Sequence, residues 1–497
     1  MKKNIFIIFA GNSLFFLSPI VSAQNVGIGT STPMEKLHVD GNILMDTAKL
    51  NSILLTTNAG PGKILTSDGI GNASWENMML PPPPPNNYNG NIGYGVWGDC
   101  ATNGNISEYN PVVDEEGAGQ DISIGDHFGY TTAISGNFAI IGSYGDDGGA
   151  GINQGSVSFY QFDGNTWIFV QKVIDEDGEA WAFFGQSISI AGNFAIVGAP
   201  QDAGNAGAGQ GSSSIYQYNG STWELMQKIT DADGAEYDNF GSSVSLSGNY
   251  AIISSPDDTG PAGPGQGSVS IYQFDGNAWV LMEKILDANG ASGDFFGHSV
   301  SISGNLFVAG SYFDDDVSGQ NQGSASIYQF DGSNWIFVQK LLDVTGVAND
   351  YFGDVVSISG NYVLVGIPND DVFGVVNQGS VCIYQYDGSN WIQTQRLYDV
   401  NGSMDDYFGS SVSVSDHFAI VGSAYDNIGT QADQGSADIY IRLGNNWERL
   451  QYVIDPRGNS YDHLGQDVAI DALTKRFLIG SHGYTSDKGK VIFGKIN

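Results

Sequence analysis

The stretch FGQSISIAGNFAIVGAPQDAGNAGAGQGSSSIYQYNGSTWELMQKI, residues 184–229, contains in one unit the pattern that predicts the fold. Short segments of alternating or continuous apolar character are separated by Gly192-Asn193, by a long loop rich in Gly and Asp, and by Asn219-Gly220, which are typical turn sequences. No helical stripe is present. We therefore predict four strands, called a, b, c and d, at 186–190, 194–198, 211–218 and 223–229.

The same unit returns every 56 residues along the chain, which predicts a repeat architecture. Phe-Gly begins at Phe128, Phe184, Phe240, Phe296, Phe352 and Phe408, and Leu464-Gly465 takes the seventh position. Gln-Gly-Ser begins at Gln154, Gln210, Gln266, Gln322, Gln378 and Gln434. A tryptophan opens strand d at Trp167, Trp223, Trp279, Trp335, Trp391 and Trp447.

Side-chain size along each unit favours a propeller over a linear solenoid. The middle of strand a is always Ser or Ala, whereas strand c carries a Tyr and strand d opens with the Trp, so bulk grows from the first strand to the last. Such a taper suits blades that converge on an axis. We predict an all-β, seven-bladed β-propeller of four-stranded blades. The seventh unit ends at strand c, so a strand within 105–113 should close the ring and avoid an open sheet edge.

Composition restricts the classes of partner. The chain has 497 residues and a formal charge of −36, from 18 Lys and Arg against 54 Asp and Glu, which argues against nucleic acid and anionic membranes. With 41% hydrophobic residues the chain can build a core. The two cysteines, Cys100 and Cys382, exclude a disulfide-dense scaffold, and whether they pair stays open.

Four regions follow one another along the chain. Residues 1–23 have the features of a signal peptide, and no later segment is apolar enough to span a membrane, so we expect a secreted or cell-surface protein without membrane insertion. Residues 24–79 form a region of different composition, residues 80–90 are a linker containing Pro81–Pro85, and residues 91–497 are the repeat domain.

Two resemblances sharpen this interpretation. Phe-Gly before strand a and Gly198-Ala199-Pro200 after strand b resemble the FG-GAP repeat family, whose best-known member is the integrin α-subunit propeller; the closer likeness is to its bacterial secreted branch. The calcium loops of the integrin repeats have no counterpart here. The segment 24–79 resembles Bacteroidetes and phage tail-fibre-like heads, which implies a β-rich stalk and homo-oligomers.

Most acidic residues fall in the b–c and d–a loops, which predicts one strongly acidic face. The repeated aspartates can cap turns by accepting backbone N–H bonds. Alternatively, clustered carboxylates can bind calcium, and the best local candidate is Asp231, Asp233 and Asp238. No cofactor is required by either interpretation.

No catalytic motif is present, and the six histidines form no zinc-binding pattern, so we expect a protein that is not an enzyme. The function that fits best is adhesion or ligand binding, to a glycan or a surface protein, through the acidic b–c and d–a loops. Two alternatives stay open, namely a secreted hydrolase or polysaccharide-processing enzyme with an acidic site at the propeller mouth, and a structural surface-layer component.

Overall fold

The computed structural model describes residues 26–28, 37–39, 63–67, 73–77, 106–113, 125–149, 151–315, 319–483 and 488–497, with side chains from residue 125 onward. The chain divides into two compact units, Met1–Asn87 and Tyr88–Asn497. In the first, β1 (Val26–Ile28) pairs in parallel with β2 (Leu37–Val39), and β3 (Lys63–Ser67) pairs antiparallel with β4 (Ala73–Asn77). The predicted signal peptide, Pro81–Pro85 and Cys100 lie outside the described residues.

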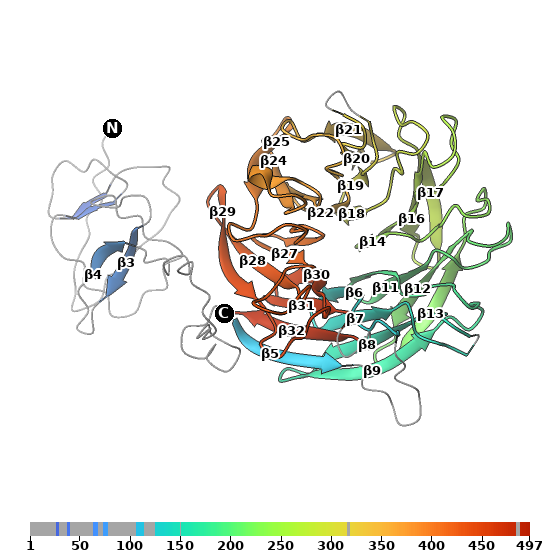
Figure 1. Ribbon diagram of the computed structural model, residues 1–497, viewed down its shortest axis with the longest axis horizontal. Helices are drawn as coiled ribbons and strands as arrows, with labels where there is room; N and C mark the ends of the chain where they lie inside the picture. Colours follow the sequence, from blue (N-terminus) through green and yellow to red (C-terminus); the bar gives the residue numbers. More distant parts are fainter. Residues whose placement is uncertain are drawn as a thin grey trace, which may run out of the picture. The chain divides into compact units, whose positions relative to one another are not determined.

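The second unit is a seven-bladed propeller of four-stranded antiparallel sheets, as predicted (Figure 1). The a strands are β6 (Thr131–Ser135), β10 (Ser187–Ala191), β14 (Val244–Ser247), β18 (Val300–Ser303), β22 (Val355–Ser359), β26 (Ser411–Ser415) and β30 (Leu464–Asp471). The b strands are β7 (Phe138–Ser143), β11 (Phe194–Ala199), β15 (Tyr250–Ser255), β19 (Leu306–Ser311), β23 (Tyr362–Ile367), β27 (Phe418–Ser423) and β31 (Arg476–Ser481).

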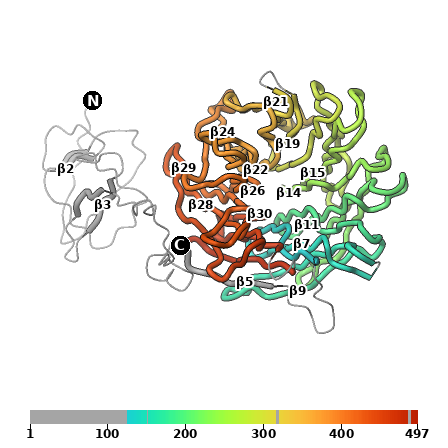
Figure 2. The backbone as a smooth tube through the Cα atoms, viewed as in Figure 1, coloured from blue at the N-terminus to red at the C-terminus, as the bar shows by residue number. Residues whose placement is uncertain are grey.

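The outer half of each blade consists of strands c and d. The c strands are β8 (Ser156–Phe162), β12 (Ser212–Tyr218), β16 (Ser268–Phe274), β20 (Ser324–Phe330), β24 (Ser380–Tyr386), β28 (Ser436–Leu443) and β32 (Lys490–Ile496). The d strands are β9 (Trp167–Ile174), β13 (Trp223–Ile229), β17 (Trp279–Ile285), β21 (Trp335–Leu341), β25 (Trp391–Leu397), β29 (Asn446–Val453) and β5 (Ile106–Val113). Figure 2 shows β14, β22, β26 and β30 near the middle of the ring and β9, β21 and β29 at its circumference.

The ring closes with the strand expected within 105–113. Strand β5 pairs antiparallel with β32 and so completes the seventh blade, in which Pro111 lies opposite Ile492. Proline has no N–H to donate, and it is accepted here because β5 is the outermost strand of its blade. In Figure 1 the cyan β5 runs beside the red β32.

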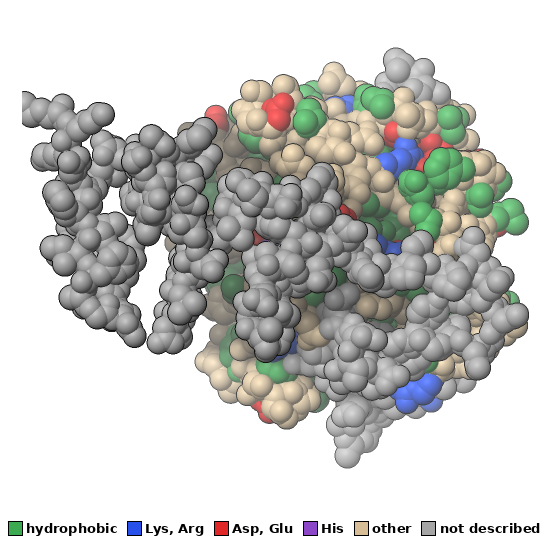
Figure 3. Space-filling view, turned by 90° about the vertical axis from the view of Figure 1, so that its left-hand side faces the viewer, with side chains coloured by type: hydrophobic (Ala, Val, Ile, Leu, Met, Phe, Trp, Pro, Cys, Tyr) green, Lys and Arg blue, Asp and Glu red, His purple; other side chains and the backbone are tan. Residues whose placement is uncertain are grey.

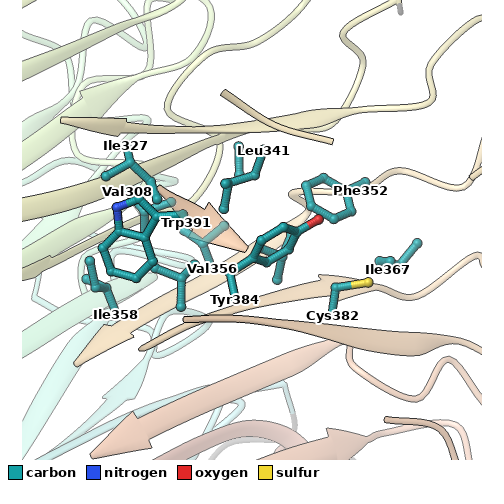
Figure 4. Packing of buried hydrophobic residues seen from close by; sticks show 13 residues of the cluster. Val308, Ile327, Leu341, Phe352, Val356, Ile358, Ile367, Cys382, Tyr384 and Trp391 are labelled. Atoms are coloured by element: carbon teal, nitrogen blue, oxygen red, sulfur yellow. The ribbon is translucent and has the colours of Figure 1, made fainter. Parts of the chain in front are cut away.

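Buried side chains of neighbouring blades meet in the seams between the sheets. Figure 4 shows one seam, where Ile327 and Leu341 of the fourth blade pack against Tyr384 and Trp391 of the fifth. The repeat tryptophan also bonds the preceding blade, because the Gln171 side-chain amide accepts from the Trp223 backbone N–H and donates to the Trp223 carbonyl, both at 2.9 Å. Strand d thus contributes apolar area and backbone bonds to the same seam.

Phe-Gly and Gln-Gly-Ser recur with one period because they touch each other across a seam. The Phe184 N–H donates to the Gln154 carbonyl at 2.9 Å, and Gly155 forms a parallel bridge with Phe184. A Cβ on Gly155 would lie 2.1 Å from the Phe184 carbonyl oxygen, and one on Gly185 would lie 2.5 Å from the Ser156 carbonyl oxygen. Only glycine permits this approach of two backbones.

The small residues of strand a have a second role that sequence reasoning missed. The Ser189 hydroxyl accepts the Leu246 N–H at 3.0 Å, and the Ser301 hydroxyl accepts the Ile358 N–H at 3.1 Å, each across to the next blade. These bonds satisfy backbone donors on the otherwise unpaired inner edge of the sheet. Between the seventh and first blades an aspartate replaces serine, since Asp467 accepts from both the backbone N–H and the hydroxyl of Thr132.

Helical structure in the described ranges is limited to one short turn, η1 (Val372–Gly374), in the b–c loop of the fifth blade. Among these residues no helix is long and apolar enough to cross a membrane.

Candidate functional site

The b–c and d–a loops emerge on one face of the propeller, because each blade is antiparallel and these loops follow strands b and d. We call this surface the loop face. It carries the repeated aspartates and, beside them, the residues next to Phe-Gly.

The repeated aspartates are largely buried and held by lysines, whereas other acids of the same loops, such as Glu176 and Asp233, are exposed. Lys228 of β13 lies 2.7 Å from Asp175, in the loop joining the first two blades, and 2.8 Å from Asp202, in the b–c loop of its own blade. Asp202 is 2% exposed and also accepts from the Ser212 hydroxyl at 2.7 Å. Burial alone would lower the pKa of Lys228, but the two carboxylates raise it above its ordinary value.

The same arrangement returns around the ring. Lys284 bridges Asp231 and Asp258, Lys340 bridges Asp287 and Asp314, and Arg396 bridges Asp343 and Asp370. Two carboxylates and one cation bring a net negative charge into each of these seams, and breaking such a buried group is strongly destabilising. The repeated aspartates therefore join blade to blade. In Figure 3, which shows one side of the molecule, red acidic atoms form small separate groups.

The calcium candidate is not assembled as a coordination site. An Asp231 carboxylate oxygen lies 2.7 Å from the Lys284 ammonium, and Asp238 accepts the Ala235 N–H at 2.5 Å. Asp233 is exposed and gives its own N–H to Asp231 at 3.2 Å. Across the described ranges, no group of three or more His, Cys, Asp or Glu side chains is placed to hold a metal ion. These contacts favour the structural role, and calcium binding stays a prediction.

Sequence reasoning missed the lysines, although a signal for them existed. Lys172, Lys228, Lys284 and Lys340 are spaced by 56, with Arg396 next in the series, in a chain that has only 18 cationic residues. Cations that keep the period of buried aspartates point to ion pairs within the repeat.

Other loop-face residues differ from blade to blade, although the ion pairs and the Phe-Gly beside them repeat. We call these repeating residues the constant frame. Four sites in each blade differ, namely the residues before and after Phe-Gly and the two residues that follow strand b. We call them the inner-loop positions. In blades one to seven they are His127, Tyr130, Tyr144 and Gly145; Phe183, Gln186, Pro200 and Gln201; Asn239, Ser242, Pro256 and Asp257; Phe295, His298, Tyr312 and Phe313; Tyr351, Asp354, Pro368 and Asn369; Tyr407, Ser410, Ala424 and Tyr425; His463, Gln466, His482 and Gly483.

Rings at these positions meet across blades. Tyr407 contacts Tyr425, with centroids 5.3 Å apart, and Tyr425 contacts His463 at 4.9 Å. His463 stacks on His482 at 5.0 Å, and His482 lies 5.4 Å from His127.

The series continues into the first two blades. His127 stacks on Tyr144 at 4.9 Å, Tyr144 meets Phe183 at 5.6 Å, and Phe183 meets Trp181 at 6.2 Å. We call these eight rings the aromatic arc. It spans blades six, seven, one and two.

The opposite side of the loop face is more polar. Gln201 donates to Asn239 at 2.5 Å and Asn239 donates to Asp257 at 2.6 Å, while a His298 nitrogen lies 3.4 Å from an Asp354 oxygen. Tyr312 stands between these groups, where burial and then the nearby carboxylates raise its pKa to about 12. This side combines hydrogen-bonding groups and two acids with a ring cluster of its own, formed by Phe295, His298, Tyr312, Phe313 and Tyr351. The arc has rings but no acid at its inner-loop positions.

The free thiol of Cys382 is fully buried in the seam between the fourth and fifth blades. Burial raises its pKa far above the ordinary value, so it is held as a thiol. This residue packs and does not form part of the loop face.

The fold and the loop face define a class: a β-propeller of the ligand-binding and adhesion type, with a repeated frame and variable inner loops. The FG-GAP repeat model matches residues 118–160, 167–216, 223–272, 279–328, 335–384 and 391–440. The chain belongs to the FG-GAP repeat family. No curated protein matches it.

Proposed function

We propose that this protein is an exported, non-catalytic display protein that binds a glycan or a surface protein through its loop face. The observation that carries the proposal is the contrast between a constant frame and variable inner-loop positions. Buried aspartates, lysines and Phe-Gly keep the period of 56, while the four neighbouring sites in each blade differ. A purely structural ring would not require such variety beside the axis.

The chemistry of the inner-loop positions suits recognition. They combine aromatic rings with amide, imidazole and phenol groups, and a few polar groups among apolar surface are typical of binding sites. Among the loop-face residues that the structure describes, Trp181, Tyr425 and Tyr461 are 54%, 40% and 60% exposed. Export and display rest on the predicted signal peptide at residues 1–23 and the stalk-like segment 24–79.

The test is to bind the full chain to arrays of glycans and of purified surface proteins and to compare two substitutions. Gln186→Arg places a bulky charge among the inner-loop positions, and we expect at least tenfold weaker binding. Asn277→Arg adds the same side chain to an exposed c–d turn on the opposite face, and we expect less than a twofold change. Equal effects of both substitutions would refute the assignment to the loop face.

A further inference from the structure

We propose that the aromatic arc binds the sugar rings of an extended, uncharged carbohydrate. The inference rests on the proposed function and names the ligand class for one part of the loop face. Its basis is the continuity of the arc and the absence of charge at its inner-loop positions.

Continuity favours a ligand that repeats. Successive centroids of the arc are 4.9 to 6.2 Å apart, so the arc is a row of rings without a break from Tyr407 to Trp181. The face of an aromatic ring carries negative charge and attracts the polarised C–H groups on the face of a pyranose. Several adjacent rings suit several linked sugars.

The absence of charged side chains at the inner-loop positions of the arc favours a neutral ligand over an anionic glycan or a basic peptide. Across the sixth, seventh, first and second blades the inner-loop positions contain no Lys, Arg, Asp or Glu. The histidine between two others, His482, stays neutral, because burial and then the neighbouring His463 and His127 lower its pKa to about 3. An anionic glycan would find no cation on the arc, and a basic peptide would find no carboxylate at these positions.

Two exposed acids of the neighbouring loops, Asp147 and Asp405, accept hydrogen bonds. Asp405 accepts from the Asn377 amide at 2.7 Å, and Asp147 accepts from the Asn153 N–H at 3.0 Å. The polar groups of the arc itself are imidazoles, phenols and one indole N–H, which exchange hydrogen bonds with hydroxyl groups. This is the chemistry that a neutral sugar requires.

Backbone conformation shows that the rings are not placed by local preference. Trp181 has φ +69°, and the same position in the other blades is Gly125, Tyr237, Gly293, Asn349, Asp405 or Tyr461. Glycine, asparagine and aspartate tolerate this left-handed region, whereas a bulky side chain there is strained. Trp181 is nevertheless more than half exposed, so burial does not compensate for the strain. Tyr237 and Tyr461 have the same conformation and similar exposure, so the strain belongs to the repeat and does not by itself distinguish Trp181.

Trp181 also provides a direct readout. The six repeat tryptophans are at most 8% exposed, so Trp181 is the accessible indole among the residues whose side chains the structure describes. The experiment titrates the full chain with cellohexaose, laminarihexaose and xylohexaose and follows tryptophan fluorescence and heat. We expect a saturable fluorescence change with at least one of them, which is absent in Trp181→Phe.

Two substitutions locate the binding. Trp181→Asn and Tyr425→Ala should each weaken binding at least tenfold. Tyr237→Asn is the matched control: Tyr237 is 60% exposed with φ +66°, and its ring contacts no ring of the arc. Both asparagine variants should raise the melting temperature by about a degree or two, because both relieve the same strain. Only Trp181→Asn should lose the ligand.

The outcomes separate the two proposals. If no neutral oligosaccharide binds but an arrayed basic or acidic partner binds and is lost with Gln186→Arg, the carbohydrate inference is wrong and the proposed function holds. If a neutral oligosaccharide binds equally to wild type, Trp181→Asn and Tyr425→Ala, the arc is not its site and the inference is also wrong. If nothing on either array binds, both proposals fail.

Discussion

In the sixth blade the pattern of the repeat is broken, and other residues of the same blade compensate for the change. The lysine of strand d is replaced in the sixth blade by Tyr452, whose hydroxyl donates to Asp426 at 2.6 Å. The missing cation comes from Arg449, 3.3 Å from Asp399 and 3.4 Å from Asp438. Asp438 and Arg449 stand where the first five blades have Ser, Cys, Leu, Phe or Gln. One cation now serves several buried carboxyl groups in this seam.

The pKa values of this seam follow from that shortage of cations. Burial raises the pKa of Asp438 to about 8 despite Arg449, and burial followed by the Asp426 charge raises that of Asp406 to about 7. The pKa of Asp426 is also raised by burial. A carboxyl group whose pKa is higher folded than unfolded binds its proton more tightly in the folded state. Its contribution to stability is therefore lost as the pH rises through the folded value.

We predict that Tyr452→Lys flattens this pH dependence. The new ammonium restores the bridge found in the second to fourth blades and lowers the raised pKa values, since one pKa unit corresponds to about 1.4 kcal/mol. Stability at pH 8.5 should increase by about 1 to 2 kcal/mol and change little at pH 5.5. Denaturant unfolding at both pH values measures the difference. Tyr452→Phe, which only removes the donor to Asp426, should steepen the pH dependence, and a flatter curve for this control would contradict the account.

At the scale of elements, the sequence predicted the repeated strands but not the contacts between residues of neighbouring blades. Strand order and the closing strand followed from periodicity and from the need to cover an edge. The bond from Leu246 to Ser189 and the contact of His127 with His482 join residues of different blades. A periodic pattern indicates that such residues are equivalent but not which of them touch. The calcium hypothesis arose in the same way, because Lys284 beside Asp231 is visible only once two blades are packed.

The Phe-Gly and Gln-Gly-Ser contact gives an element-scale prediction. Gly185→Ala puts a Cβ 2.5 Å from a backbone oxygen at φ +93°, so the seam between the first and second blades must open. We expect a loss of about 3 kcal/mol or more, from steric overlap added to backbone strain. Gly192→Ala is the control, since its φ is +60° but no atom lies within 4 Å of the new Cβ. It should cost about 1 kcal/mol. Equal losses in denaturant unfolding would show that the close approach does not limit the seam.

At the scale of the whole molecule, stability depends on closing the ring. Each seam is an interface between neighbours, and in a linear repeat array stability adds from one neighbour to the next. A closed ring gains one more interface, here between the seventh and first blades, where Phe128 pairs with Gly489 and Thr132 bonds Asp467. Strand β5 ties the beginning of the propeller to its last strand, so both chain ends of the propeller take part in one sheet.

We predict that a chain beginning at Gly117, which lacks β5, unfolds at a lower temperature and aggregates, whereas a chain beginning at Asn91 does not. Val491, Ile492 and Phe493 of β32 are at most 1% exposed, and without β5 the backbone of this strand becomes an open sheet edge that can pair with other chains. Calorimetry and light scattering on the two chains measure the effect. A synthetic peptide covering 103–116, added to the shorter chain, should restore the melting temperature in a concentration-dependent way, because it binds only the folded ring. Equal melting temperatures for the two chains, or a peptide without effect, would mean that the seventh blade is stable with three strands.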